Sequence, residues 1–104
     1  MKVQNMESAR GNKIANQFII TDSIIKYTDP KTGERLTTGL GDVFQSYNSV
    51  IAFKDEDNSI LIDEHYWDYS VTTGRYRNQF LNENKKETQA KIDSGEYKLV
   101  NLNE

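Results

Sequence analysis

The stretch "VFQSYNSVIAFKDEDNSILIDEHYWDY", residues 43–69, decides the fold. Its two outer parts, residues 43–54 and 60–69, are rich in β-branched and aromatic side chains, as β-strands are. The five residues between them, "DEDNS", are polar and favour a turn. The stretch therefore predicts two antiparallel strands joined by a short acidic turn, with a bend in the first strand at residues 47–48.

The pattern changes from strand to helix after Tyr69. Hydroxyl residues at positions 70, 72 and 73 are suitable N-caps for a helix that continues to residue 81. Tyr76 and Phe80 stand at the i,i+4 spacing that places two side chains on one helix face. The sequence therefore predicts a helix directly after the second strand.

A second helix and a last strand complete the C-terminal part. Asn84 is a suitable N-cap for "KKETQAKIDS", residues 85–94, and Gly95 stands where a glycine commonly ends a helix. The final run "EYKLVNL" has the composition of a strand. Two C-terminal helices followed by a strand are expected.

Towards the N-terminus, "KIANQFIIT" at residues 13–21 predicts another strand. Residues 1–12 lack hydrophobic periodicity and are expected to form a flexible arm. Residues 28–42 collect glycine, proline and threonine and are expected to form a mobile loop. The prediction is a single domain over residues 13–104 of the α+β class. Its mainly antiparallel sheet has four to five strands, with two C-terminal helices and a final strand.

The composition restricts the chemistry available to the chain. None of the 104 residues is cysteine, which excludes disulfides, thiolate nucleophiles and cysteine-ligated metals. Mean hydropathy is −0.79, and no apolar run has the length of a signal peptide or a membrane span. A cytoplasmic protein is expected.

No motif indicates an enzyme, a cofactor or a metal site. His65 is the only histidine, and two ligands such as Asp63 and His65 make a poor metal site on their own. The "GLGD" at residues 39–42 precedes a predicted strand, whereas phosphate-binding glycines follow a strand and open a helix. We therefore expect no catalytic residues, no metal ligands and no cofactor.

Negative charge is concentrated in residues 55–74, although the net charge of the whole chain is only −3. This segment contains no lysine or arginine, and an acidic surface suits a basic partner such as a nucleic-acid-binding protein. Solvation alone also explains such a segment. Its acidic residues are Asp55, Glu56, Asp57, Asp63, Glu64 and Asp68.

Aromatic residues add a second possible contact surface. Trp67, Tyr69 and Tyr76 are expected in the core or at its edge, because a small domain buries most of its large rings. Tyr47 and Tyr66 are the rings expected to be exposed, and tyrosine is frequent in binding hot spots. An alternative surface would bind nucleic acid through these rings and a basic strip. That strip would consist of Arg75, Arg77, Lys85 and Lys86.

Two stretches, "FQSYNSVIA" and "YWDYSVTTGRYRNQFL", together with the C-terminal "KKETQAKIDSGEYKLVNLN", resemble a family of small, mostly uncharacterised proteins. These are encoded by bacteriophages, plasmids and integrative elements, chiefly of Gram-positive bacteria. The resemblance implies an accessory protein of a mobile element, which would act in the cytoplasm of the bacterial host cell. It covers residues 14–20 and 43–103, and residues 22–41 match nothing in the pattern.

The leading hypothesis is a non-enzymatic binding protein of a phage or mobile element. It would inhibit a host defence nuclease, as anti-CRISPR and anti-restriction proteins do, and its acidic surface with Tyr47 and Tyr66 would contact a nucleic-acid-binding nuclease such as a CRISPR effector. The alternative is a nucleic-acid-binding accessory protein.

Overall fold

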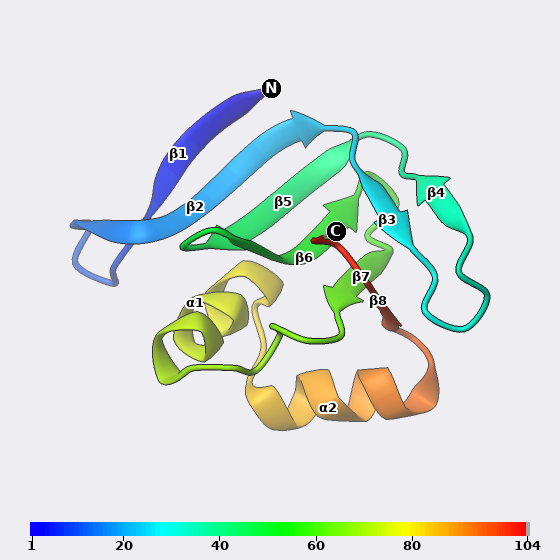
Figure 1. The fold of residues 1–104 in the computed structure, drawn as a ribbon. Coiled ribbons are helices and arrows are strands. Elements are labelled where there is room, and N and C mark those ends of the chain that lie inside the picture. The colour runs from blue at the N-terminus through cyan, green and yellow to red at the C-terminus, as the bar shows by residue number, and fades with distance from the viewer. Residues whose placement is uncertain (104) are drawn as a thin grey trace.

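The computed structural model describes residues 1–103 and contains a curved six-stranded sheet with both helices on one face (Figure 1). The sheet strands are β1 (Lys2–Glu7), β2 (Lys13–Ser23), β5 (Gly41–Ser46), β6 (Ser49–Asp55), β7 (Ile60–Asp63) and β8 (Lys98–Val100). Their order in the sheet is β1-β2-β5-β6-β7-β8, and only β7 and β8 pair in parallel. The predicted α+β class, with its mainly antiparallel sheet, is confirmed.

Both helices begin and end as the capping residues predict. α1 (Val71–Leu81) starts after Ser70, whose side chain accepts a hydrogen bond from the Thr73 N–H. α2 (Lys85–Ser94) starts after Asn84 with a reciprocal capping box to Glu87, and its last residue precedes Gly95 at a φ of 84°. These local signals are strong because each one satisfies backbone groups that a helix end leaves unpaired.

The main core lies between the helices and the sheet. It consists of two clusters of buried side chains, and the partly buried Trp67 and Phe80 pack against both. The rings of Phe44 on β5 and Phe80 on α1 stack at 5.8 Å. The buried members are Met6, Phe44, Ile51, Ala52, Ile60, Ile62, Tyr76, Leu81 and Tyr97. The predicted core positions of Trp67 and Tyr76 are thus confirmed.

The opposite face of the sheet is also covered near its centre. Val43 and Phe53 are paired across β5 and β6, point away from the helices and are buried. Phe53 borders a cavity of about 210 Å³ together with Tyr27. Gly41 lies so close to the neighbouring strand that a Cβ atom there would overlap the Phe53 ring and the Lys54 carbonyl. A larger residue at position 41 would therefore force the two strands apart.

A buried carboxylate ties α2 to the chain on either side of it. The Glu83 carboxylate accepts hydrogen bonds from Thr88 Oγ1 at 2.6 Å and from Lys91 Nζ and Tyr97 Oη, each at 2.8 Å. Burial acts to raise the pKa of Glu83, but these hydrogen bonds outweigh it and hold the pKa below its ordinary value. Burial and the same carboxylate raise the pKa of Tyr97 to about 12.

Two predictions about the N-terminal half are wrong. Residues 1–12 are not an arm, because β1 pairs with β2 and buries Met6. As the outer strand of the sheet, β1 is exposed at most other positions, so its sequence shows little periodicity. Residues 28–42 are not a loop throughout, because β3 (Lys26–Thr28) and β4 (Arg35–Thr37) form a two-stranded ribbon. Two backbone hydrogen bonds between Thr28 and Asn101, both 2.9 Å, attach this ribbon to the C-terminal segment.

Two further predictions about strands are wrong. The expected bend at residues 47–48 is a complete turn, which makes β5 and β6 separate strands of a hairpin. The strand expected to reach Tyr69 ends at Asp63. The Asp63 carboxylate accepts hydrogen bonds from the N–H groups of His65 and Tyr66, which turns the chain away from the sheet.

Candidate functional site

Three hydroxyl groups hold the β5–β6 turn against the start of α1. Ser46 Oγ and Thr73 Oγ1 lie 2.8 Å apart in the interior, and the Ser70 hydroxyl donates to Thr73 Oγ1 at 3.0 Å. Tyr47 follows Ser46 in the chain and Tyr69 precedes Ser70. The hydroxyl contacts therefore bring these two tyrosines to the same part of the surface.

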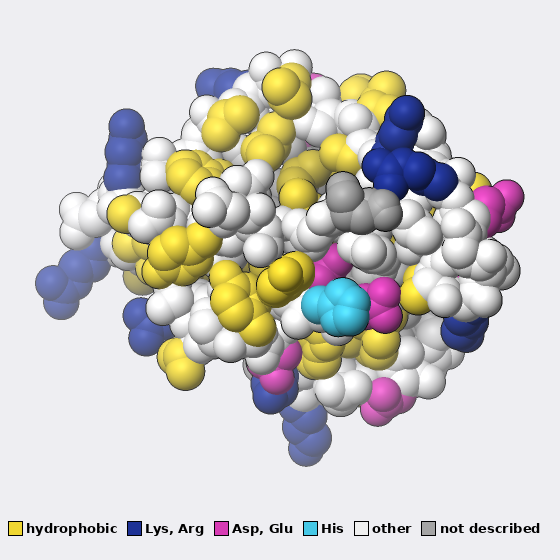
Figure 2. All heavy atoms as spheres, viewed as in Figure 1, with side chains coloured by type: hydrophobic (Ala, Val, Ile, Leu, Met, Phe, Trp, Pro, Cys, Tyr) yellow, Lys and Arg dark blue, Asp and Glu magenta, His cyan; other side chains and the backbone are white. Residues whose placement is uncertain are grey.

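We use "tyrosine patch" for Tyr47, Tyr66 and Tyr69, whose exposed fractions are 47%, 37% and 45%. The rings of Tyr66 and Tyr69 pack edge to face at 5.4 Å, and the exposed His65 ring lies 6.4 Å from Tyr66. Figure 2 shows hydrophobic side chains gathered beside the single histidine, which is coloured cyan. Rigid, partly exposed tyrosines supply contact area at a low entropic cost.

The backbone of Tyr47 adopts an unusual conformation. Its φ of 55° lies in the left-handed region, which costs a residue with a side chain roughly 1 kcal/mol or more. The strained turn is held by the Tyr47 N–H, which donates to the Asn16 carbonyl at 2.7 Å, and by the Gln45 amide, which donates to the Tyr47 carbonyl at 2.8 Å. Glycine or asparagine would adopt this backbone conformation at a lower cost than tyrosine. Strain of this kind is concentrated at functional sites.

The buried side chain of Arg77 supports the segment that leads to Tyr69. This side chain is 1% exposed and donates to the Trp67 carbonyl at 2.5 Å and to the Asn78 side chain at 2.8 Å. Its guanidinium also lies 5.1 Å from the centre of the Trp67 ring and 3.6 Å from Asp68. Burial lowers the pKa of Arg77, and the Asp68 carboxylate opposes that shift. Arg77 thus holds Trp67 and Asp68, the two residues that precede Tyr69.

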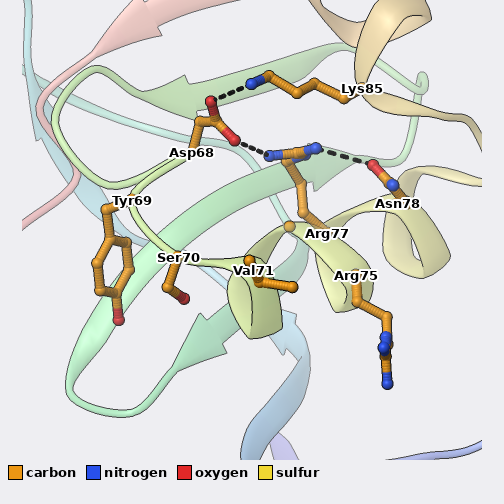
Figure 3. Close-up of a pocket in the computed structure, with 9 residues that line it drawn as sticks. Asp68, Tyr69, Ser70, Val71, Arg75, Arg77, Asn78 and Lys85 are labelled. Carbon is orange, nitrogen blue, oxygen red and sulfur yellow. Dashed lines mark hydrogen bonds and ion pairs between the residues drawn. The ribbon is translucent and has the colours of Figure 1, made fainter.

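A shallow groove of about 800 Å³ adjoins the patch at Tyr69. Figure 3 shows Asp68 between Arg77 and Lys85, with Tyr69 pointing away from this ion-paired group. Lys85 Nζ lies 2.6 Å from the Asp68 carboxylate. Arg75 borders the groove, and its side chain makes no hydrogen bond or ion pair with residues 1–103. Of the residues that the structure describes, three cations and one carboxylate therefore border the groove.

The six acidic residues predicted to bind a partner do not form one surface. Asp63 is completely buried, and besides ending β7 it accepts a hydrogen bond from the Leu102 N–H at 2.8 Å. Asp55 is partly buried and stabilises its own turn by accepting from the N–H groups of Asp57 and Ser59. The predicted role of Asp63 at an interface is therefore wrong, because a buried carboxylate with these contacts supports the fold.

The remaining four acidic residues lie at different places. Glu56 and Asp57 are exposed at the β6–β7 turn, which is at the opposite end of β6 from Tyr47. Glu64 lies 3.9 Å from His65, and Asp68 is occupied by Arg77 and Lys85. An acidic hairpin that acts as a single contact surface is thus contradicted by the geometry.

The predicted basic strip is also divided. Arg77 is buried and unable to reach nucleic acid, so its predicted role is wrong. Arg75, Lys85 and Lys86 are exposed, but Lys85 is paired with Asp68. The expected exposure of Tyr47 and Tyr66 is confirmed.

The exposure of two residues is not predicted by the sequence. Tyr69 was expected at the core edge, and Val71, which is 85% exposed, was not considered. The available signal was Ser70: a residue just before an N-cap lies outside the helix, and the first helical residue of a surface helix often points to solvent. In a strand that reaches Tyr69, by contrast, alternation sets this ring on the same face as Trp67.

A family model matches residues 1–96. The chain belongs to DUF8033, a family of unknown function. Neither the curated proteins nor the solved structures gave a significant match. Within residues 1–103, none of the helices has the length and apolar character needed to cross a membrane. The same residues contain no group of three or more histidine, aspartate or glutamate side chains arranged to hold a metal ion.

Proposed function

We propose that this protein is a non-enzymatic binding protein of a phage or mobile element, and that it inhibits a host defence nuclease by contacting it through the tyrosine patch. The observation that carries the proposal is the placement of three partly exposed tyrosines on a rigid base. Tyr47 in particular keeps an aromatic ring exposed at a strained backbone position. Such a surface costs stability and is explained by a contact outside the chain.

The class of partner rests on the resemblance to small proteins of mobile elements. Products of this kind often act against host nucleases by binding them. The absence of a recognisable catalytic motif in the sequence agrees with this class. Glu56 and Asp57 remain available for a secondary contact with a basic surface, because both are exposed at the β6–β7 turn.

The test is the efficiency of plaquing of a targeted phage on host strains that carry an active CRISPR or restriction system. Expression of the protein should restore plaquing on at least one strain. The double substitution Tyr66→Ser with Tyr69→Ser should abolish this effect, whereas Glu56→Lys with Asp57→Lys should retain most of it. Unchanged plaquing on every strain with a defence system would refute the nuclease proposal.

Nucleic-acid binding is a second candidate, favoured by one observation. Tyr69 belongs to the tyrosine patch and also borders the groove that contains Arg75 and Lys85, so a ring and cations stand together. A single strand would then stack a base on tyrosine and place a phosphate near the cations. This function predicts binding that weakens steeply with salt, which fluorescence anisotropy of a labelled oligonucleotide would measure.

A further inference from the structure

The groove beside the tyrosine patch has a positive character that the net charge of the chain conceals. Arg75, Arg77 and Lys85 border it, and among residues 1–103 Asp68 is the only carboxylate that does so. Residues of the first turn of α1 and the first residue of α2 border it as well. Helix N-termini carry partial positive charge, so the two helices add to the field of the three cations.

Asp68 shows that this place accommodates a carboxylate. Its oxygens lie 2.6 Å from Lys85 Nζ and 3.6 Å from an Arg77 nitrogen. Asp68 pairs with Lys85 and Arg77, and Glu83 also attracts the charge of Arg77. Arg75 points away from the ion-paired group in Figure 3, and it has no acidic partner among residues 1–103. A second anionic group placed near Arg75 would therefore be attracted without having to displace Asp68.

We infer that the groove is a subsite for one carboxylate of the protein partner, an aspartate or glutamate side chain whose apolar neighbours contact the tyrosine patch. This inference rests on the proposed function, since it takes the partner to be a protein. A single side chain fits better than a nucleic-acid strand, because a strand presents a row of phosphates. Beyond Arg75, the groove offers only Lys85, which is paired, and Arg77, which is buried.

The partner segment has a definite character under this inference. It carries one acidic residue beside apolar or aromatic residues, and it meets Tyr69 and Val71 at the boundary between patch and groove. This charge is opposite to the one suggested by the acidic residues of the sequence. The difference arises because those residues are buried, paired or distant from the patch.

The experiment is a titration of the isotope-labelled protein, followed by the backbone amide signals in NMR spectra. The probes are a capped pentaglutamate peptide, the matching pentaglutamine peptide and a ten-nucleotide oligothymidylate. Pentaglutamate should shift the signals of residues 69–75 and of Lys85, and pentaglutamine should leave them in place. Absent shifts with pentaglutamate, or saturation by oligothymidylate at a lower concentration, would overturn the inference.

Substitutions in the titrated protein test whether the group bound in the groove is negatively charged. Arg75→Gln should weaken pentaglutamate binding about fivefold, since unit charges 4 Å apart interact by about 1 kcal/mol even in bulk water. Lys31→Gln, at the tip of the ribbon, removes the same charge elsewhere and should have a smaller effect. Asp68→Asn should strengthen binding, whereas a site for a basic ligand would respond in the opposite direction. Equal effects of Arg75→Gln and Lys31→Gln, or weaker binding by a folded Asp68→Asn, would contradict the assignment.

The titration is independent of the nuclease. If pentaglutamate fails to bind while the plaquing effect depends on the tyrosines, the carboxylate subsite is refuted and the proposed function is supported. If pentaglutamate binds as expected while no defence system is inhibited, the subsite stands and the partner is another protein.

Discussion

Replacement of Arg77 by methionine should destabilise the protein by about 3 kcal/mol. The largest part comes from the hydrogen bond to the Trp67 carbonyl at 2.5 Å, because bonds that involve a charged group contribute about 1.5–3 kcal/mol. The cation–π contact with the Trp67 ring at 5.1 Å adds roughly 0.5–1 kcal/mol. Asp68 is partly exposed and keeps Lys85 as a partner, so its ion pair with Arg77 adds at most about 1 kcal/mol. Burial of the methionine side chain offsets a part of this loss.

The matched control is Arg75→Met, two positions earlier on the same helix. Arg75 is exposed, so its replacement should change stability by about 0.5 kcal/mol or less. Urea denaturation followed by circular dichroism and by the fluorescence of the single tryptophan gives both free energies of unfolding. If Arg77→Met cost less than about 1 kcal/mol, or no more than Arg75→Met, Arg77 would not support the segment that leads to Tyr69.

Three further predictions concern single residues. The free energy of unfolding should begin to fall as the pH drops below about 4.5, because the folded-state pKa of Glu83 is lowered and protonation removes its hydrogen bonds. Glu83→Gln should make this decrease shallower, as denaturation curves measured at several pH values would show. Gly41→Ala should cost about 1–3 kcal/mol from overlap with the neighbouring strand, whereas Gly39→Ala, where a Cβ meets nothing within 4 Å, should be nearly neutral in urea denaturation. Tyr47→Asn should keep or raise the melting temperature, since asparagine tolerates the left-handed conformation. The same substitution should weaken the plaquing effect. A marked loss of stability would show instead that the ring supports the fold.

The parts of the fold that local chemistry specifies were predictable. Both helices follow from caps and a terminal glycine within a few residues of one another, and the central strands follow from their composition. β1 escaped prediction because an edge strand is held mainly by backbone hydrogen bonds to β2, which leave no pattern in the side chains. The ribbon at 26–37 escaped for a similar reason, since its attachment depends on Asn101 at the other end of the chain.

The site was predictable only in part, because burial of a charged residue depends on distant partners. Arg77 looks like a surface cation in sequence, yet Trp67 and Asp68 of the preceding segment enclose it. Asp63 looks like a member of an acidic surface, yet the backbone of Leu102 places it in the interior. The exposure of Tyr47 agrees with its place at the expected bend, and that of Tyr66 was expected because strand alternation sets it with Glu64 and Asp68, opposite Trp67. The exposure of Tyr69 was not predicted, because β7 ends at Asp63 and does not reach residue 69.

The most direct test of the tyrosine patch is a quantitative pull-down from host lysate whose nucleic acid has been digested by an added enzyme. It compares the wild type with Tyr66→Ser/Tyr69→Ser and with Glu56→Lys/Asp57→Lys, after circular dichroism has shown that both variants are folded. We predict that the wild type captures a defence nuclease and that the capture persists after digestion of the nucleic acid. The tyrosine variant should lose this nuclease, and the charge-reversal variant should retain it. Retention of the nuclease by the tyrosine variant, or its loss only with the charge-reversal variant, would contradict a contact through the tyrosine patch.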